Sequence, residues 1–128
     1  MINDTIDILD ANVINLRIDF SMIAFADTNK FRALDTARRD LASFFRQRKN
    51  FDIGEPFLIS DIFSVLKSSG PVLDVVDVIV TTQIGELYAN TNFSSEDNLS
   101  SDGRMIMCPP DSIFEIKYPN SDIVGTLV

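Results

Sequence analysis

Residues Asn50–Leu66 read NFDIGEPFLISDIFSVL and lie between two patterns of helical periodicity. Gly54 suits a tight turn there, because glycine adopts positive φ without a clash at Cβ. Pro56 fixes its own φ and favours an extended conformation for Glu55, so a short extended segment should follow. The stretch therefore predicts a helix, a turn, an extended segment and a second helix, in that order.

The second helix should begin near Ser60, whose hydroxyl can serve as an N-cap. Gly70 followed by Pro71 is a typical signal for the end of a helix. Gly54, Pro56 and Gly70 are therefore expected to be structural residues. The apolar residues of this helix lie close together along the chain: Ile62, Phe63, Val65 and Leu66.

A longer helix is predicted before the turn, from about Lys30 to Lys49, with Asp27, Thr28 or Asn29 as its N-cap. Its apolar residues recur at intervals of three and four and should form one buried stripe. They are Phe31, Leu34, Ala37, Leu41, Phe44 and Phe45.

Alternation of apolar and polar residues predicts a strand over residues 13–25, with one face on the core and the other largely wet. Residues 72–84 are rich in β-branched side chains and predict a second, well covered strand. A turn at Pro119–Asp122 predicts a C-terminal hairpin. Three short extended segments are expected near the C-terminus: Met105–Cys108, Ile113–Tyr118 and Ile123–Val128.

Residues 90–103 are rich in Asn, Ser, Thr and acidic residues, and we expect an exposed loop that is mobile or ordered only by a partner. Residues 1–12 allow a short helix, a strand or the lead-in from a larger structure. The order of the elements predicts a single α+β domain over residues 1–128. Its small sheet should be mixed or antiparallel, with two helices packed on one face and the hairpin at the C-terminus.

Composition narrows the possible functions. A chain of 128 residues with 45% apolar content can bury a real core. The net charge of −8 argues against nucleic-acid binding, and no apolar run is long enough for a membrane helix. The acidic N-terminus lacks the basic region of a secretory signal, and a single cysteine fits a reducing compartment. We expect no nucleic-acid and no membrane partner.

The chain has no histidine, which excludes Ser-His, Cys-His and His-metal sites. Cys108 stands between Met107 and Pro109 with no neighbouring base, and we interpret it as a small buried apolar residue. Asn98–Gly103 resembles the start of a calcium loop, but Pro109 occupies the position of the bidentate Glu. The glycines are too scattered for a phosphate loop, and no pair of acids marks a cleft. We therefore expect no catalytic residue, no metal site and no cofactor.

Seven of the eleven basic residues fall in the predicted first helix, together with Asp35 and Asp40, so this segment carries +5 and the remainder −13. A solvated helix face is the simpler interpretation. The functional interpretation is a polar domain whose basic side meets the acidic side of a neighbour, a contact that can build a ring. The candidate interface residues, on this helix and at the turn, are Arg32, Arg39, Arg46, Asp52 and Glu55.

The first strand, the first helix, the turn FDIGEP and the following ISDI together resemble the C-terminal domain of baseplate J-like proteins. In that family a glycine and a valine-rich strand follow the second helix. Here Gly70 and the valines of residues 72–76 occupy those positions. The ending FEIKYPNSDIVG, Phe114–Gly125, is closer still to the large baseplate wedge proteins of T4-like phages. The resemblance covers residues 13–128, nearly the whole chain.

This resemblance implies a structural role without catalytic residues. Such proteins form the wedges of contractile-tail baseplates and join with copies of themselves and with other wedge proteins in a ring around the hub. It implies a virion protein of the tail baseplate, assembled in the host cytoplasm, whose partners are itself (dimer or ring) and other baseplate wedge proteins. Since family members are much longer, this chain is expected to be the C-terminal part of a larger protein or an unusually short member.

Two other classes of function stay open. One is a small acidic adaptor domain that binds a single protein partner as a monomer. The other is an enzyme with carboxylate chemistry, which would need a concave site that holds two acids with raised pKa values.

Overall fold

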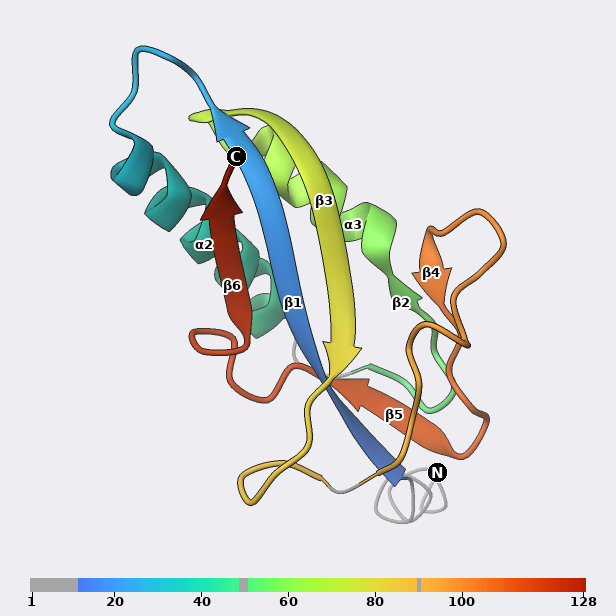
Figure 1. Cartoon of the computed structure of the whole chain (residues 1–128). Helices are drawn as coiled ribbons and strands as arrows, with labels where there is room; N and C mark the ends of the chain where they lie inside the picture. The colour runs from blue at the N-terminus through green and yellow to red at the C-terminus, as the bar shows by residue number, and fades with distance from the viewer. Residues whose placement is uncertain (1–11, 49–50, 90) are drawn as a thin grey trace.

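A computed structural model describes residues 12–48, 51–89 and 91–128. Residues 1–11 therefore lie outside the described residues, and so does Lys49, the last residue of the predicted first helix. The α+β class predicted from the sequence is confirmed (Figure 1). The elements are β1 (Asn12–Ala24), α2 (Lys30–Gln47), β2 (Phe57–Leu58), α3 (Ile59–Ser68), β3 (Val72–Thr82), β4 (Met105–Ile106), β5 (Ser112–Glu115) and β6 (Ile123–Leu127).

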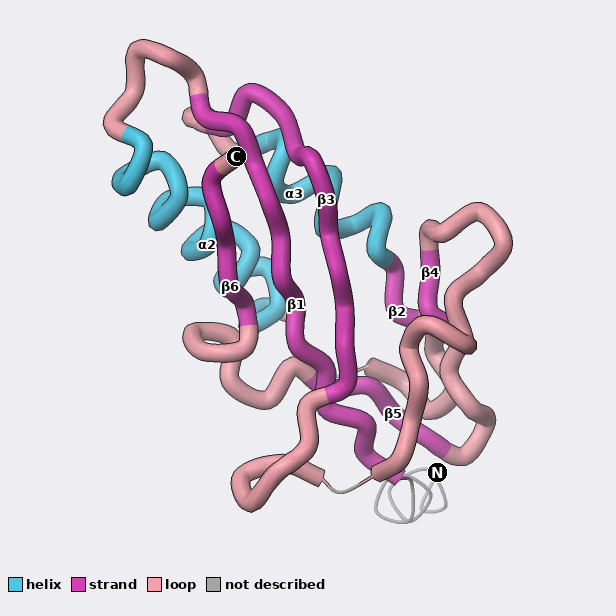
Figure 2. The backbone as a smooth tube through the Cα atoms, in the orientation of Figure 1, coloured by secondary structure: helices cyan, strands magenta, loops and turns pink. Residues whose placement is uncertain are grey.

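The sheet is built around β1, which pairs with three other strands (Figure 2). β3 runs antiparallel to β1, whereas β5 and β6 run parallel to it, so the sheet is mixed as expected. β2 and β4 form a separate two-stranded antiparallel sheet. Both helices lie behind the larger sheet (Figure 1). Part of the other face is covered by the segment after β3, where the backbone N–H of Ala89 donates to the side chain of the buried Asn15.

The buried face predicted for β1 is confirmed. The prediction that its other face is largely wet is wrong, because Asn15 is buried and the other side chains of that face from Arg17 to Ile23 are half-buried. The side chains of Ile14, Leu16, Ile18, Phe20 and Met22 are all buried and form the centre of the core. The ring of Phe57, just after the turn, packs in this core between α2 and β5. Its centroid lies 5.6 Å from that of Phe45 on α2 and 6.3 Å from that of Phe114 on β5.

The buried stripe of α2 differs from the prediction. The residues that face the core include Ala33, Ala37, Leu41 and Phe45, spaced by four, whereas Phe31 is 82% exposed. Because each helical residue turns by about 100°, Phe31 lies on nearly the opposite side of the helix from Ala33. The N-cap is Asn29, whose side-chain oxygen accepts a hydrogen bond from the backbone N–H of Arg32 at 3.1 Å.

β3 was expected to be well covered, and this prediction is wrong. The register against β1 shifts twice, so that Leu73 and Val76 have no opposite residue and bulge from the strand. Each bulge moves the following side chains to the other face, and only Val72, Val75 and Val80 are buried. The bulges end strict alternation and leave much of this apolar strand at the surface.

The predicted C-terminal hairpin is also wrong, although both of its strands exist. β5 pairs in parallel with residues 12–15 of β1, and β6 pairs in parallel with residues 18–22. The segment between them closes on itself, because the Tyr118 carbonyl accepts from the backbone N–H groups of Ser121 and Asp122 at 2.9 and 2.8 Å. β6 therefore runs in the same direction as β5. The two strands pair with successive parts of β1, which is long enough for both.

Ser60 is not the N-cap of α3, which begins at Ile59, two residues earlier than an N-cap at Ser60 requires. The backbone N–H groups of Ile59 and Ser60 donate instead to the carbonyl of Arg104, at 2.8 and 3.3 Å. A distant carbonyl thus satisfies the helix terminus, and the Ser60 side chain has no capping role. The predicted stop at Gly70 is close, since α3 ends at Ser68, and Gly70 does not adopt positive φ.

The segment predicted as an exposed loop contains no strand or helix among residues 91–103. The structure orders it against the chain's own sheet. The Thr91 hydroxyl donates to the carbonyl of Val13 at 2.7 Å, and the Ser95 hydroxyl donates to that of Val80 at 2.7 Å. The ring of Phe93 packs edge-on against that of Phe114, with centroids 5.5 Å apart.

Candidate interaction surfaces

The turn after α2 has the backbone predicted for it. Gly54 adopts a φ of +76°, and its N–H donates to the carbonyl of Ser112 at 2.8 Å. The Glu55 carboxylate accepts from the backbone N–H of Asp52 at 2.8 Å and forms an ion pair with Arg48. Glu55, a candidate interface residue, therefore stabilises the turn, while Asp52 is exposed to solvent.

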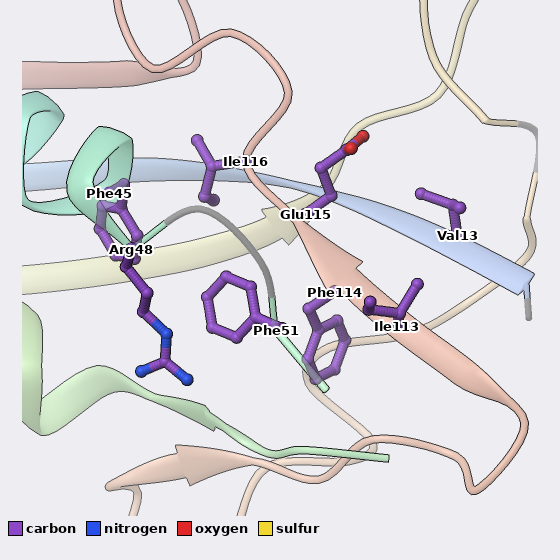
Figure 3. A pocket seen from close by; sticks show the side chains of 8 residues that line it. All are labelled: Val13, Phe45, Arg48, Phe51, Ile113, Phe114, Glu115 and Ile116. Atoms are coloured by element: carbon purple, nitrogen blue, oxygen red, sulfur yellow. The ribbon is translucent and has the colours of Figure 1, made fainter. Parts of the chain in front are cut away.

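A small pocket lies between this turn and β5 (Figure 3). The guanidinium of Arg48 lies 4.3 Å from the ring centroid of Phe51, and its Nη1 atom lies 4.0 Å from Oδ2 of Asp61. The pocket has a volume of only about 70 Å³. That space suits a few water molecules and is well below the usual size of a ligand site.

The basic side of α2 is partly occupied by the chain's own groups. Arg46 donates to the side-chain oxygen of Asn120 at 2.6 Å, and Arg38 donates to the Asn120 carbonyl at 3.2 Å. Arg39 forms an ion pair with Asp35. Arg38 and Arg46 thus hold the loop before β6, and Arg39 pairs with an acid of its own helix. The predicted set Arg32, Arg39 and Arg46 is exposed along one side of α2, but its members have different roles.

The first turn of α2 carries Lys30, Phe31 and Arg32, which we call the helix tip. All three side chains are exposed. Within the described residues, neither cation forms an ion pair. Sequence reasoning missed Phe31 as a surface residue. The signal that could have revealed it is the competing apolar series spaced by four, which begins at Ala33 and continues through Ala37 and Leu41.

An open apolar groove lies at the other edge of the sheet, between the end of β3 and the segment 93–99. Its volume is about 680 Å³. We call it the β3 groove. Its walls include Ile79, Ile84, Phe93 and Leu99, and the acidic Glu96 also lines it. Sequence reasoning did not find this groove, because it depends on the bulges of β3 and on the path of residues 91–103.

Two observations concern the groups that could take part in metal binding or nucleophilic chemistry. No group of three or more acidic or cysteine side chains lies close enough there to hold a metal ion. The Cys108 thiol is half-buried and donates to the Ser112 carbonyl at 3.2 Å. Burial raises the pKa of this thiol, with a further contribution from Asp111, so the reactive thiolate is disfavoured. Neither α2 nor α3 is long and apolar enough to cross a membrane.

Comparison with protein-family models, with curated proteins and with solved structures finds no match for this chain. The residues and surfaces described above are therefore the basis for a functional proposal.

Proposed function

We propose that this chain is a structural assembly domain of the baseplate wedge in a contractile-tailed phage. It is a non-enzymatic virion component that associates with copies of itself and with other wedge proteins in the ring around the hub. The observation that carries the proposal is the exposed apolar surface of β3 and the segment after it. Its exposed side chains are Leu73, Val76, Ile79, Ile84 and Leu87.

Exposed apolar side chains in such number on one strand and its continuation are typical of a surface that contacts protein. The two helices lie on one side of the sheet (Figure 1), and among the described residues nothing buries these side chains. The sequence resemblance supplies the kind of assembly, since the turn at Gly54 and the ending Phe114–Gly125 are similar to wedge proteins.

A monomeric acidic adaptor is the second candidate function. It is favoured by the internal partners of Glu55, Arg39 and Arg46, which leave fewer free charges for self-association than the sequence predicts. The two functions differ in location, because only a wedge domain is a permanent part of the virus particle.

The proposed function is tested on purified particles of the phage that encodes this chain. We expect mass spectrometry to find the chain in intact tails, and an antibody against the domain to label the baseplate end of the tail in electron micrographs. An antibody against a tail-sheath protein serves as the positional control. Particles with intact baseplates that lack the chain would contradict the proposal and favour the adaptor.

A further inference from the structure

The helix tip is an unusual surface feature. Phe31 is among the most exposed large apolar residues that the structure describes. It stands between Lys30 and Arg32, neither of which forms an ion pair within the described ranges. An aromatic ring left in water in this way is typical of an anchor that enters a pocket on a partner. The flanking charges predict a partner surface that is acidic around an apolar centre.

The β3 groove has these properties. Its apolar walls include Ile79, which is 53% exposed, and Leu99, which is 43% exposed. Glu96 also lines the groove and is exposed, and the exposed Asp97 follows it in the chain. Within the described residues, neither acid forms an ion pair with a basic side chain.

The two features are complementary in chemistry and are separated in space. Phe31 borders β6, through a hollow shared with Val124 and Gly125, whereas the groove lies along β3. β6 and β3 lie on opposite sides of β1 (Figure 1), so one copy cannot fill its own groove with its own helix tip. The segment 1–11 is a poorer occupant, because it carries three aspartates and no basic residue.

We propose that the occupant is a second copy of this chain, whose Phe31 inserts into the β3 groove while Lys30 and Arg32 approach Glu96 and Asp97. The contact is head-to-tail, so each copy uses one surface to bind and offers the other. Repetition builds a ring or an open chain of copies. This inference rests on the proposed function and specifies which surfaces of the domain associate.

Two single variants test the contact on the full chain by light scattering and sedimentation over a range of concentrations. Phe31→Gln removes the anchor, and Ile79→Lys places a cation in the groove that repels the helix tip. Each should weaken self-association at least about 30-fold, as loss of an interface hot spot does. The matched control Phe25→Gln changes another exposed aromatic residue, which lies outside both the helix tip and the groove, and should associate like the unmodified chain.

Mixing the two weakened variants gives the decisive result. The Phe31→Gln copy keeps an intact groove and the Ile79→Lys copy keeps an intact helix tip, so one contact can form between them. We expect the mixture to form a heterodimer that grows no further. Unchanged thermal melting of both variants shows that they fold. Glu96→Lys is a second groove variant, and it should also weaken association.

Other results would overturn the inference. A chain that is monomeric at every concentration excludes docking of a second copy and leaves a different protein as the occupant. Association that survives both substitutions, or a mixture that stays monomeric, places the contact elsewhere. Failure here is distinct from failure of the proposed function: a monomeric chain that is nevertheless found in the baseplate refutes only the head-to-tail contact.

Discussion

Gly125 of β6 lies opposite Phe20 of β1, and the ring of Phe20 fills the space that a side chain at position 125 would need. A Cβ atom there would lie 2.5 Å from Cζ of Phe20 and 2.8 Å from Cδ1 of Leu34 on α2. Both distances are shorter than van der Waals contact. Because position 125 has no side chain, α2 can pack closely against the sheet where β1 and β6 pair.

Gly125→Val should lower the free energy of unfolding by about 1–3 kcal/mol, the usual cost of overpacking a core. Urea denaturation measures the change. Gly70→Ala is the control, because its Cβ would have no atom within 4 Å and its φ is not positive. The control should stay within about 0.5 kcal/mol of the unmodified chain. Equal effects at the two glycines would contradict this account of the packing.

At the turn, the stability cost of replacing Gly54 should depend on how well the new residue tolerates positive φ. Its φ of +76° is unfavourable for residues with a Cβ, and a β-branched side chain suffers most. Gly54→Val should cost about 1–2 kcal/mol or more, whereas Gly54→Asn should cost less because asparagine tolerates this conformation. Thermal or urea unfolding of both variants checks the order. Normal stability of Gly54→Val would refute the assignment of the turn.

Phe93 should be a structural residue of the segment that the sequence predicts as an exposed loop. Its ring packs on Phe114, and the neighbouring backbone is tied to β3 by the Thr82 hydroxyl, which donates to the Phe93 carbonyl at 2.8 Å. Phe93→Ala should destabilise the domain by about 1–3 kcal/mol. Asn92→Ala, at an exposed neighbouring position, should be nearly neutral. If the two variants unfold alike, the segment is not packed as described.

Asp35 provides a prediction about pH. The Arg39 side chain donates a hydrogen bond to its carboxylate and holds the pKa of Asp35 below its ordinary value, with Arg38 adding to the effect. Because the folded pKa is the lower one, the contribution of this pair to stability is complete above the ordinary pKa of about 4 and is lost as the pH falls through the folded value. The pair is exposed, so the effect on stability is small.

Arg39→Gln should therefore raise the pKa of Asp35 toward its ordinary value. Carboxyl-carbon NMR during a pH titration measures this pKa directly. Arg46→Gln, which removes a cation that contacts Asn120 instead, is the matched control and should leave the pKa of Asp35 unchanged. A pKa that does not respond to loss of Arg39 would show that the ion pair does not form in solution.

Several features could be predicted because they depend on neighbouring residues. Alternation identifies β1, helical spacing identifies α2 and α3, and Gly54 identifies the turn, since each pattern reflects the local backbone geometry. The candidate interface was harder to predict. Charge spacing alone cannot show that Arg46 contacts Asn120 or that Glu55 contacts Arg48, because each partner is chosen by the folded chain.

The amino-acid sequence by itself determined that this chain is an α+β domain, with one long amphipathic strand, two helices and a tight turn at Gly54. Only the tertiary structure decided that β5 and β6 both pair with β1, that Arg104 caps α3, and that Phe31 and the β3 groove lie at the surface. The physical reason is separation along the chain. The side-chain hydrogen bond from Asn15 to Glu115 joins residues 100 positions apart, and such contacts form only where packing brings the two segments together.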